Sequence, residues 1–181
     1  MKVVSRVEWG ARAPKAQSLR ALDEVVGMVF HHSGGFVSSS SSFEQECASV
    51  RAIQNWCMDH HGYADIDYEC LVGPSGNLYQ GRAMTVVEAA QSGTWNGLPA
   101  NHSLLACCFL GDLNQEPVTA AAKDAALGAV WLAALGLRGS KGVMRDFMSH
   151  NHLSHTGGIT TACCGNNGRA FVASSLHGMI S

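Results

Sequence analysis

Short apolar runs alternate along this chain with stretches of helical periodicity, and this alternation limits the folds that the sequence can adopt. In chain order they cover residues 25–30 (strand), 43–60 (helix), 68–72 and 78–80 (paired strands), 103–110 (strand), 119–135 (helix) and 143–150 (strand). Strands that alternate with helices are typical of an α/β fold. The length of 181 residues suits one domain. We therefore expect a single domain over residues 1–181, with a central mixed β-sheet flanked by helices.

Local signals support the individual elements. An amphipathic helix is indicated by the three- and four-residue steps between Phe43, Cys47, Val50, Ile53 and Cys57. Thr119 is the expected N-cap of the second helix, and Gly136 is its expected C-terminal stop. The nearly continuous apolar run at 103–110 predicts a central strand that is covered on both faces. The turn at residues 73–76 predicts a hairpin between its two flanking strands.

Charge and hydropathy exclude several kinds of partner. The formal net charge is -2, and no dense block of lysine and arginine is present, whereas nucleic acids and anionic membranes need clustered positive charge. No apolar run reaches the roughly 18 to 20 residues that cross a bilayer. We therefore expect neither a nucleic-acid partner nor a membrane partner. The N-terminus becomes polar too early for a secretory signal, so we expect the protein to start in a cytoplasm.

The seven cysteines form an odd set, so at least one thiol is free, metal-bound or paired with another chain. Most of them lie in apolar periodic segments, where a reduced cysteine acts as a small hydrophobic residue. We expect four or five of them to fill the core. The adjacent Cys163 and Cys164 are open to other roles, including a vicinal disulfide.

Histidines gather near the ends of two predicted strands and indicate a metal site. The cluster comprises His31 and His32 after the first strand, His150, His152 and His155 after the last, and Cys163 and Cys164 a short loop later. Zinc prefers imidazole nitrogen and thiolate sulfur, and a catalytic site uses three protein ligands. Neighbouring residues on a strand point to opposite faces, so only one of His31 and His32 can reach an ion, whereas His150 and His152 would share a face. Spacing leaves open which residues bind, and each could instead be a hydrogen-bonded structural group.

A set of motifs, in a fixed order, extends over about residues 4 to 170. They are residues 5–12 (SRVEWGAR), 29–33 (VFHHS), 50–56 (VRAIQNW) with 58–59 (MD), 65–68 (DIDY), 71–73 (LVG), 76–82 (GNLYQGR), 109–112 (FLGD) and 162–165 (ACCG). This ordered set resembles the phage amidases and animal peptidoglycan recognition proteins that share the type-2 amidase fold.

The resemblance implies a site and an activity. Position by position, it implies that His31, His150 and Cys163 bind Zn²⁺, that Tyr68 is catalytic and that Thr161 assists. The implied reaction is hydrolysis of the amide between N-acetylmuramic acid and L-alanine in bacterial peptidoglycan. The implied partner is therefore a muropeptide, and we expect the protein to act as a monomer.

Four departures from the family pattern bear on these expectations. Asn151 and His152 stand where Arg-Asp usually follows the second ligand histidine, and Cys164 stands where proline usually follows the ligand cysteine. A histidine that is common after Val-Gly-Ala in the family is absent around Gln91. Of the cysteine pair that forms a disulfide in the animal proteins, only Cys47 is present, which favours a phage or bacterial setting.

Two functions follow from this reading. The first is a phage or prophage endolysin, held in the host cytoplasm before its release to the cell wall. The alternative is a peptidoglycan-binding recognition module without catalysis. The sequence retains Cys163, the ligand that non-hydrolytic relatives commonly lose, and this favours the enzyme.

Overall fold

The core of the molecule is a six-stranded sheet. A computed structural model describes residues 1–35, 37–38, 40–157 and 161–176 of the chain. The sheet has the order β1-β4-β3-β7-β2-β8, with the strands β1 (Lys2–Val4), β2 (Gly27–His32), β3 (Cys70–Val72), β4 (Asn77–Gln80), β7 (Leu104–Phe109) and β8 (Asp146–Ser149). Only the pair β3 and β4 is antiparallel, and the other neighbours are parallel. The predicted mixed sheet is thus confirmed.

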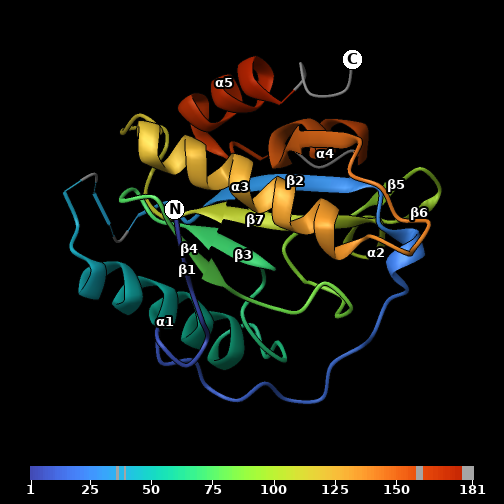
Figure 1. Cartoon of the computed structure of the whole chain (residues 1–181), viewed down its shortest axis with the longest axis horizontal. Coiled ribbons are helices and arrows are strands. Elements are labelled where there is room, and N and C mark those ends of the chain that lie inside the picture. The colour runs from blue at the N-terminus through green and yellow to red at the C-terminus, as the bar shows by residue number, and fades with distance from the viewer. Residues whose placement is uncertain (36, 39, 158–160, 177–181) are drawn as a thin grey trace.

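Helices cover both faces of the sheet, as Figure 1 shows, with α1 on one side and α3 and α5 on the other. The helices are η1 (Leu22–Glu24), α1 (Phe43–Asp59), α2 (Ala100–Ser103), α3 (Ala120–Gly136), α4 (His150–Gly157) and α5 (Gly165–Ser175). A separate two-stranded ribbon consists of β5 (Thr94–Trp95) and β6 (Leu98–Pro99). The arrangement is the α/β architecture that the alternation of elements predicts.

Two apolar layers hold the helices to the sheet. The layer under α3 and α5 includes Phe30, Phe109 and Phe171, whose ring centroids lie 5.7 to 6.2 Å apart. The layer under α1 includes Val50 and Cys108. All six residues of β7 are buried, so the prediction of a central strand covered on both faces is confirmed.

The helix boundaries follow from capping. Ser42 starts α1, because its hydroxyl accepts the Gln45 N–H while the Gln45 side chain accepts the Ser42 N–H. Thr119 starts α3 as predicted, and its hydroxyl accepts the Ala122 N–H. Gly136, predicted as a stop, is instead the last residue within α3, and the C-cap is Leu137.

The prediction of a strand over residues 143–150 is wrong at its end. Strand β8 pairs with β2 only from Asp146 to Ser149, and α4 starts at His150. The Ser149 hydroxyl accepts the His152 N–H at 3.2 Å, as an N-cap residue does. His150 and His152 therefore lie about 200° apart around a helix rather than on one face of a strand.

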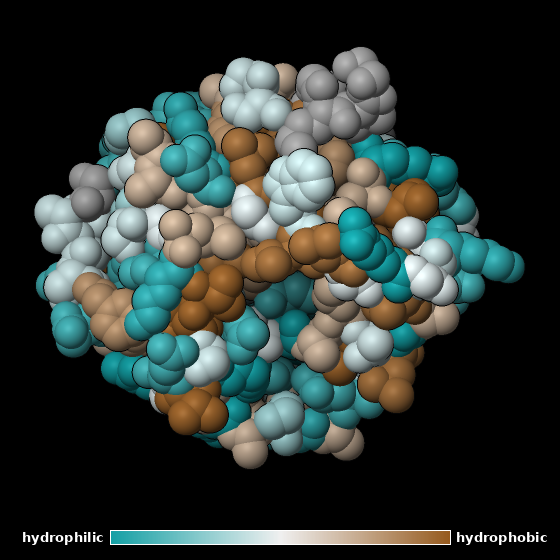
Figure 2. All heavy atoms as spheres, in the orientation of Figure 1, coloured by the Kyte–Doolittle hydropathy of each residue, from teal (hydrophilic) through white to brown (hydrophobic). Residues whose placement is uncertain are grey.

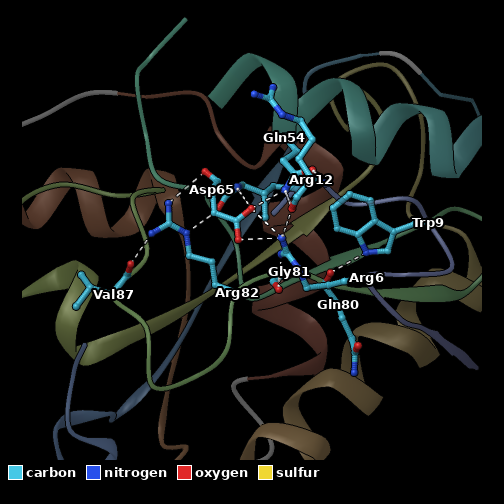
Figure 3. Close-up of polar contacts among 10 residues, drawn as sticks. Arg6, Trp9, Arg12, Gln54, Asp65, Gln80, Gly81, Arg82 and Val87 are labelled. Carbon is cyan, nitrogen blue, oxygen red and sulfur yellow. Dashed lines mark hydrogen bonds and ion pairs between the residues drawn. The ribbon is translucent and has the colours of Figure 1, made fainter. Parts of the chain in front are cut away.

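The buried Asp65 carboxylate joins the N-terminal segment to α1 (Figure 3). One of its oxygens accepts hydrogen bonds from Arg6 at 3.0 Å and Gln54 at 2.6 Å, and the other lies 3.0 Å from Arg6. The same carboxylate also accepts the Ile66 N–H at 2.8 Å. Two of the motifs that carry the family resemblance, residues 5–12 and 65–68, are thus held together by one acid.

Arg82 extends this network toward the sheet (Figure 3). Its guanidinium donates to the carbonyls of Ile66 at 2.5 Å, Val87 at 2.6 Å and Asp65 at 3.2 Å. Its backbone N–H donates to the Tyr68 carbonyl at 2.9 Å. The backbone of residues 65–68, which carries Tyr68, is therefore held by hydrogen bonds at both of its ends.

The surface turned to the viewer in Figure 2 is hollowed next to α3. A pocket of about 390 Å³ lies between α3 and the sheet. Leu105 and Leu132 contribute apolar wall, and Glu69 and Arg82 contribute polar lining. Glu69 is paired with Arg20 and accepts the Ala106 N–H at 2.6 Å. The polar lining is thus engaged within the chain.

Candidate metal centre

Three side chains from separate segments converge at one end of the sheet. His31 comes from β2, His150 is the first residue of α4, and Cys163 lies in the turn before α5. One possible ligand atom from each lies within 4.8 Å of the other two. The Cys163 Sγ is 3.7 Å from the His31 Nδ1, and the two imidazole centroids are 4.6 Å apart. Two nitrogens and one sulfur at this spacing can surround a single ion.

The sheet register explains why the two histidines meet. Strands β2 and β8 are parallel neighbours, and Phe30 is the register partner of Ser149. His31 and His150 each follow one residue later, so both lie where the two strands end. Parallel strands place their carboxyl ends at the same edge of a sheet. The register between β2 and β8 therefore places His31 and His150 at the same edge of the sheet.

Hydrogen bonds hold the Cys163 turn against this edge. The Asn151 N–H donates to the Cys163 carbonyl at 2.6 Å, and the Asn151 side chain donates to the Thr161 carbonyl. The His32 N–H donates to the Cys163 Sγ at 3.4 Å. Asn151, which departs from the usual family pattern, thus fastens the turn to the start of α4.

The remaining members of the predicted cluster lie elsewhere or are not described. The His32 imidazole accepts the Leu113 N–H at 3.1 Å. Cys164 is buried in the apolar layer under α5, and His152 is exposed. The side chain of His155 lies outside the described residues. The structure therefore brings together the three residues that the family resemblance names.

Burial keeps both imidazoles neutral. Burial, with help from the nearby His150, lowers the pKa of His31 to about 3, and the hydrogen bond to Gln91 opposes this shift. Burial also lowers the pKa of His150. Neutral imidazole is the form that binds a metal ion. Both rings are therefore ready to bind a cation at neutral pH without losing a proton.

Cys163 differs from the two histidines in its protonation. Burial raises the pKa of its thiol to about 11, although the His32 N–H opposes the shift. The thiol is thus protonated at neutral pH unless a cation replaces the proton, because a thiolate needs a positive partner in such a place. The donor set of two imidazoles and one thiolate fits Zn²⁺, which prefers these ligands.

Tyr68 lies beside the cluster, two residues before β3. Its ring centroid is 5.4 Å from that of His31. Burial is the main cause that raises the pKa of the Tyr68 hydroxyl well above its usual value, and Cys108 and Asp67 add to the shift. The hydroxyl therefore keeps its proton and can act as a hydrogen-bond donor.

Thr161 lies in the Cys163 turn. Its hydroxyl oxygen accepts the Cys163 N–H at 3.2 Å. This bond holds the turn and leaves the hydroxyl proton available to another acceptor. Its predicted assistance in catalysis stays a prediction.

Gln91 is a member of the site that the sequence did not indicate. Its Oε1 lies 3.0 Å from the His31 Nε2, and both side chains are buried. The one signal in the sequence was that Gln91 falls near a position where the family pattern has histidine. No local periodicity connects it to His31, which lies 60 residues earlier.

All seven cysteines are free thiols. Cys47, Cys57, Cys107, Cys108 and Cys164 are buried, while Cys70 and Cys163 are half-buried. Five buried cysteines agree with the expectation that four or five fill the core. The adjacent Cys163 and Cys164 do not form a disulfide.

Comparison with known proteins shows that the chain is similar in sequence to peptidoglycan-recognition proteins. It is 32% identical to peptidoglycan-recognition protein SC2 of Drosophila simulans over 126 residues, which are 70% of this chain and 64% of that protein. It is 31% identical to peptidoglycan recognition protein 1 of Rattus norvegicus over 127 residues, which are 69% and 64% of the two chains. The matches thus span slightly less than two thirds of each relative. No protein-family model matches the sequence.

Solved structures show the same fold. Drosophila PGRP-LB superposes with a TM-score of 0.80 at 23% identity, over 97% of this chain and 95% of that chain. Human PGRP-IβC in complex with glycosamyl muramyl pentapeptide gives a TM-score of 0.78 at 22% identity, over 97% and 96%. This chain therefore has the fold of the peptidoglycan-recognition proteins and type-2 amidases, and its sequence is similar to those of peptidoglycan-recognition proteins. Within the described part of the chain, no helix is both long and apolar enough to span a membrane.

Proposed function

We propose that this protein is a zinc-dependent N-acetylmuramoyl-L-alanine amidase, which hydrolyses the amide between N-acetylmuramic acid and L-alanine in peptidoglycan. The observation that carries the proposal is the convergence of His31, His150 and Cys163, whose ligand atoms lie within 4.8 Å of one another. Three protein ligands of this kind are typical of a catalytic zinc site, in which one position is left for water or substrate.

Each part of the centre has a role in this proposal. His31, His150 and Cys163 would hold the zinc ion, which would supply Lewis-acid chemistry toward the amide carbonyl and a bound water molecule. His31 and His150 bind as neutral imidazoles, because burial lowers the pKa of both rings. Cys163 binds as a thiolate and gives up its proton when the ion enters.

Tyr68 is the proposed electrostatic catalyst. In amide hydrolysis, water adds to the carbonyl carbon and gives up a proton, and negative charge develops on the carbonyl oxygen. The C–N bond then breaks as the alanine nitrogen takes up the proton that the water released. The Tyr68 hydroxyl keeps its proton because burial raises its pKa, so it can donate a hydrogen bond to that developing charge. The Thr161 hydroxyl, half-buried beside Cys163, is proposed as a second donor.

The test is digestion of purified peptidoglycan. Zinc-loaded protein is expected to release peptides with new N-terminal alanine, and removal of zinc by a chelator is expected to stop the release until zinc is added back. New reducing sugar ends without new N-terminal alanine would refute this cleavage class. Digestion that persists at full rate after verified removal of zinc would refute the metal.

A recognition module without catalysis is the second candidate, and the names of the relatives favour it. The similar proteins from Drosophila and rat are named recognition proteins, and one solved neighbour is described in complex with glycosamyl muramyl pentapeptide. For this chain, the candidate predicts that metal-free protein binds a muropeptide and that zinc-loaded protein leaves it intact. Calorimetry with a defined muropeptide, followed by mass spectrometry of the same sample, separates the two functions.

The biological setting is a further part of the proposal. The seven free cysteines, with Cys47 buried in the layer under α1, support a reducing compartment, which suits an endolysin that acts from the host cytoplasm. Expression inside a bacterium should then cause lysis only when the inner membrane is permeabilised. Lysis without permeabilisation, or dependence of the folded state on an oxidised cysteine pair, would contradict this setting.

A further inference from the structure

The two ring nitrogens of His31 have different surroundings. Nδ1 faces the Cys163 Sγ at 3.7 Å and lies on the side of the other possible ligands. Nε2 faces the Gln91 Oε1 at 3.0 Å. A neutral imidazole carries one proton, so one nitrogen donates a hydrogen bond while the other keeps the lone pair that a metal needs. The tautomer of His31 therefore decides whether its metal-facing nitrogen can bind.

The orientation of the Gln91 amide settles which nitrogen is the donor. The Gln91 Nε2 lies 3.5 Å from the Ala100 carbonyl, which only accepts hydrogen bonds. With the amide reversed, its oxygen would face that carbonyl, and two acceptors would oppose each other. The hydrogen-bond pattern therefore assigns the Gln91 oxygen to the side of His31 and the His31 Nε2 as the donor. The lone pair of Nδ1 is then directed at the cluster.

Gln91 is itself held firmly in place. The residue is 4% exposed, and its backbone N–H donates to the Asn101 Oδ1 at 3.1 Å. The Ala100 N–H in turn donates to the Gly93 carbonyl at 2.9 Å, and this bond joins the two ends of the loop from Gly93 to Ala100. An acceptor that is buried and fixed in this way can select one tautomer, because the alternative would leave a buried group without its partner.

We propose that Gln91 is a positioning residue for the metal centre, which fixes His31 in the Nε2–H tautomer and so presents the Nδ1 lone pair to the metal ion. The proposal rests on the proposed function for the identity of the ion. The part of the proposal that concerns the His31 tautomer applies to the metal-free protein and does not depend on which ion binds. Removal of the residue that hydrogen-bonds to the second ring nitrogen of a ligand histidine typically lowers metal affinity 10- to 100-fold.

The first measurement is the tautomer in metal-free protein. Long-range ¹H–¹⁵N spectra of the imidazoles are expected to show that the His31 Nε2 is protonated and Nδ1 is unprotonated at pH 7. The His31 signals are assigned by comparison with the spectrum of His31→Ala. In Gln91→Met, whose side chain has similar length and no amide oxygen, we expect the Nδ1–H form to appear. A wild-type protein with Nδ1 protonated would overturn the proposal, whether or not zinc binds.

The second measurement is zinc affinity, by competition with a chromophoric chelator. Gln91→Met is expected to weaken zinc binding about 10- to 100-fold. Gln91→Glu keeps an oxygen acceptor behind His31 and is expected to restore most of the affinity. Gln80→Met, the same substitution at an exposed glutamine on β4, is the matched control and should bind zinc like the wild type. Each variant is first checked for an unchanged thermal transition.

The outcomes separate the two proposals. Equal zinc affinity of Gln91→Met and the wild type would overturn the role of Gln91 and leave the proposed amidase intact. A wild-type protein that binds no zinc would overturn the amidase, while the imidazole spectra would still decide what Gln91 does to His31.

Discussion

The Asp65 network and the candidate metal centre both contain buried ionisable side chains, and they differ in what surrounds these side chains. Around Asp65, the carboxylate meets Arg6, Gln54 and a backbone N–H within 3.0 Å. In the metal centre, His31 and Cys163 direct Nδ1 and Sγ toward each other at 3.7 Å. The first cluster is complete without a ligand. The second brings together three donor atoms that an ion would satisfy.

This difference distinguishes buried ionisable groups that stabilise the fold from buried ionisable groups that form a functional site. A buried charge is tolerated when partners within the chain compensate it, and the Asp65 network meets this condition. Buried imidazoles and a thiol that converge instead have their pKa values shifted away from charge. Perturbed groups in one cluster are typical of a functional site. The following predictions test whether the two clusters can be disrupted independently.

The largest expected effect is on catalysis. Cys163→Ser removes a proposed zinc ligand, so zinc content should fall from about one ion per chain to near zero. A catalytic metal contributes several kcal/mol of charge stabilisation, so the amidase rate should fall by about 10³-fold or more. Metal analysis and release of N-terminal alanine are the measurements. The thermal transition of the metal-free protein should stay close to that of the wild type, and a large loss of folding would mean that Cys163 is structural.

Disruption of the Asp65 network should have the opposite signature. Asp65→Ala leaves Arg6 and Gln54 without their shared acceptor in a buried place, which typically costs about 3 to 5 kcal/mol of unfolding free energy. For a chain of this length the melting temperature should fall by about 6 to 20 °C. Calorimetry measures the change. The fraction that remains folded should still bind zinc, and loss of zinc from folded protein would show that the clusters are coupled.

The third prediction separates catalysis from metal binding within the centre. Tyr68→Phe removes one hydroxyl and keeps the ring beside His31. Loss of one donor to a developing oxyanion typically costs 10² to 10³ in rate, while zinc affinity should be unchanged. Steady-state kinetics and chelator competition measure the two quantities. A rate within a few-fold of the wild type would remove Tyr68 from the mechanism.

The smallest expected effect is the pH dependence of zinc binding. Burial raises the pKa of Cys163 to about 11, so zinc must displace one proton from this thiol at neutral pH. Zinc affinity should therefore rise about tenfold per pH unit between pH 7 and pH 9. Calorimetry in buffers with different ionisation enthalpies should show release of one proton. In Cys163→Ser, any zinc affinity that remains should no longer rise tenfold per pH unit.

Acid pH should also weaken the metal-free fold. Burial lowers the pKa of His31 to about 3 from its usual 6.5. The unfolded chain therefore binds the proton more readily than the folded chain between these values. The contribution of His31 to stability is complete above about pH 6.5 and is lost as the pH falls toward 3. His31→Gln should flatten this part of the stability profile measured by denaturant titration.

Several elements could be predicted because their signals are local. The helical stripe from Phe43 and the N-cap at Thr119 act within a few residues, and both helices begin where these signals predict. The apolar run of β7 likewise predicts its burial. Strand β1 was not predicted, because three residues that pair with β4 form too short a pattern to recognise. The start of α4 was missed because the hydroxyl of Ser149 caps it, and serine occurs equally well in loops.

The sequence by itself determined the alternation of strands and helices and the family resemblance, together with the residue types of the site, because these depend on order and composition. The family resemblance already named His31, His150 and Cys163, but only the tertiary structure showed that their possible ligand atoms lie within 4.8 Å of one another. The tertiary structure also placed the Gln91 Oε1 within 3.0 Å of the His31 Nε2. The physical reason is that the direction of a side chain depends on strand register and on what buries each face, and contacts between distant segments set both.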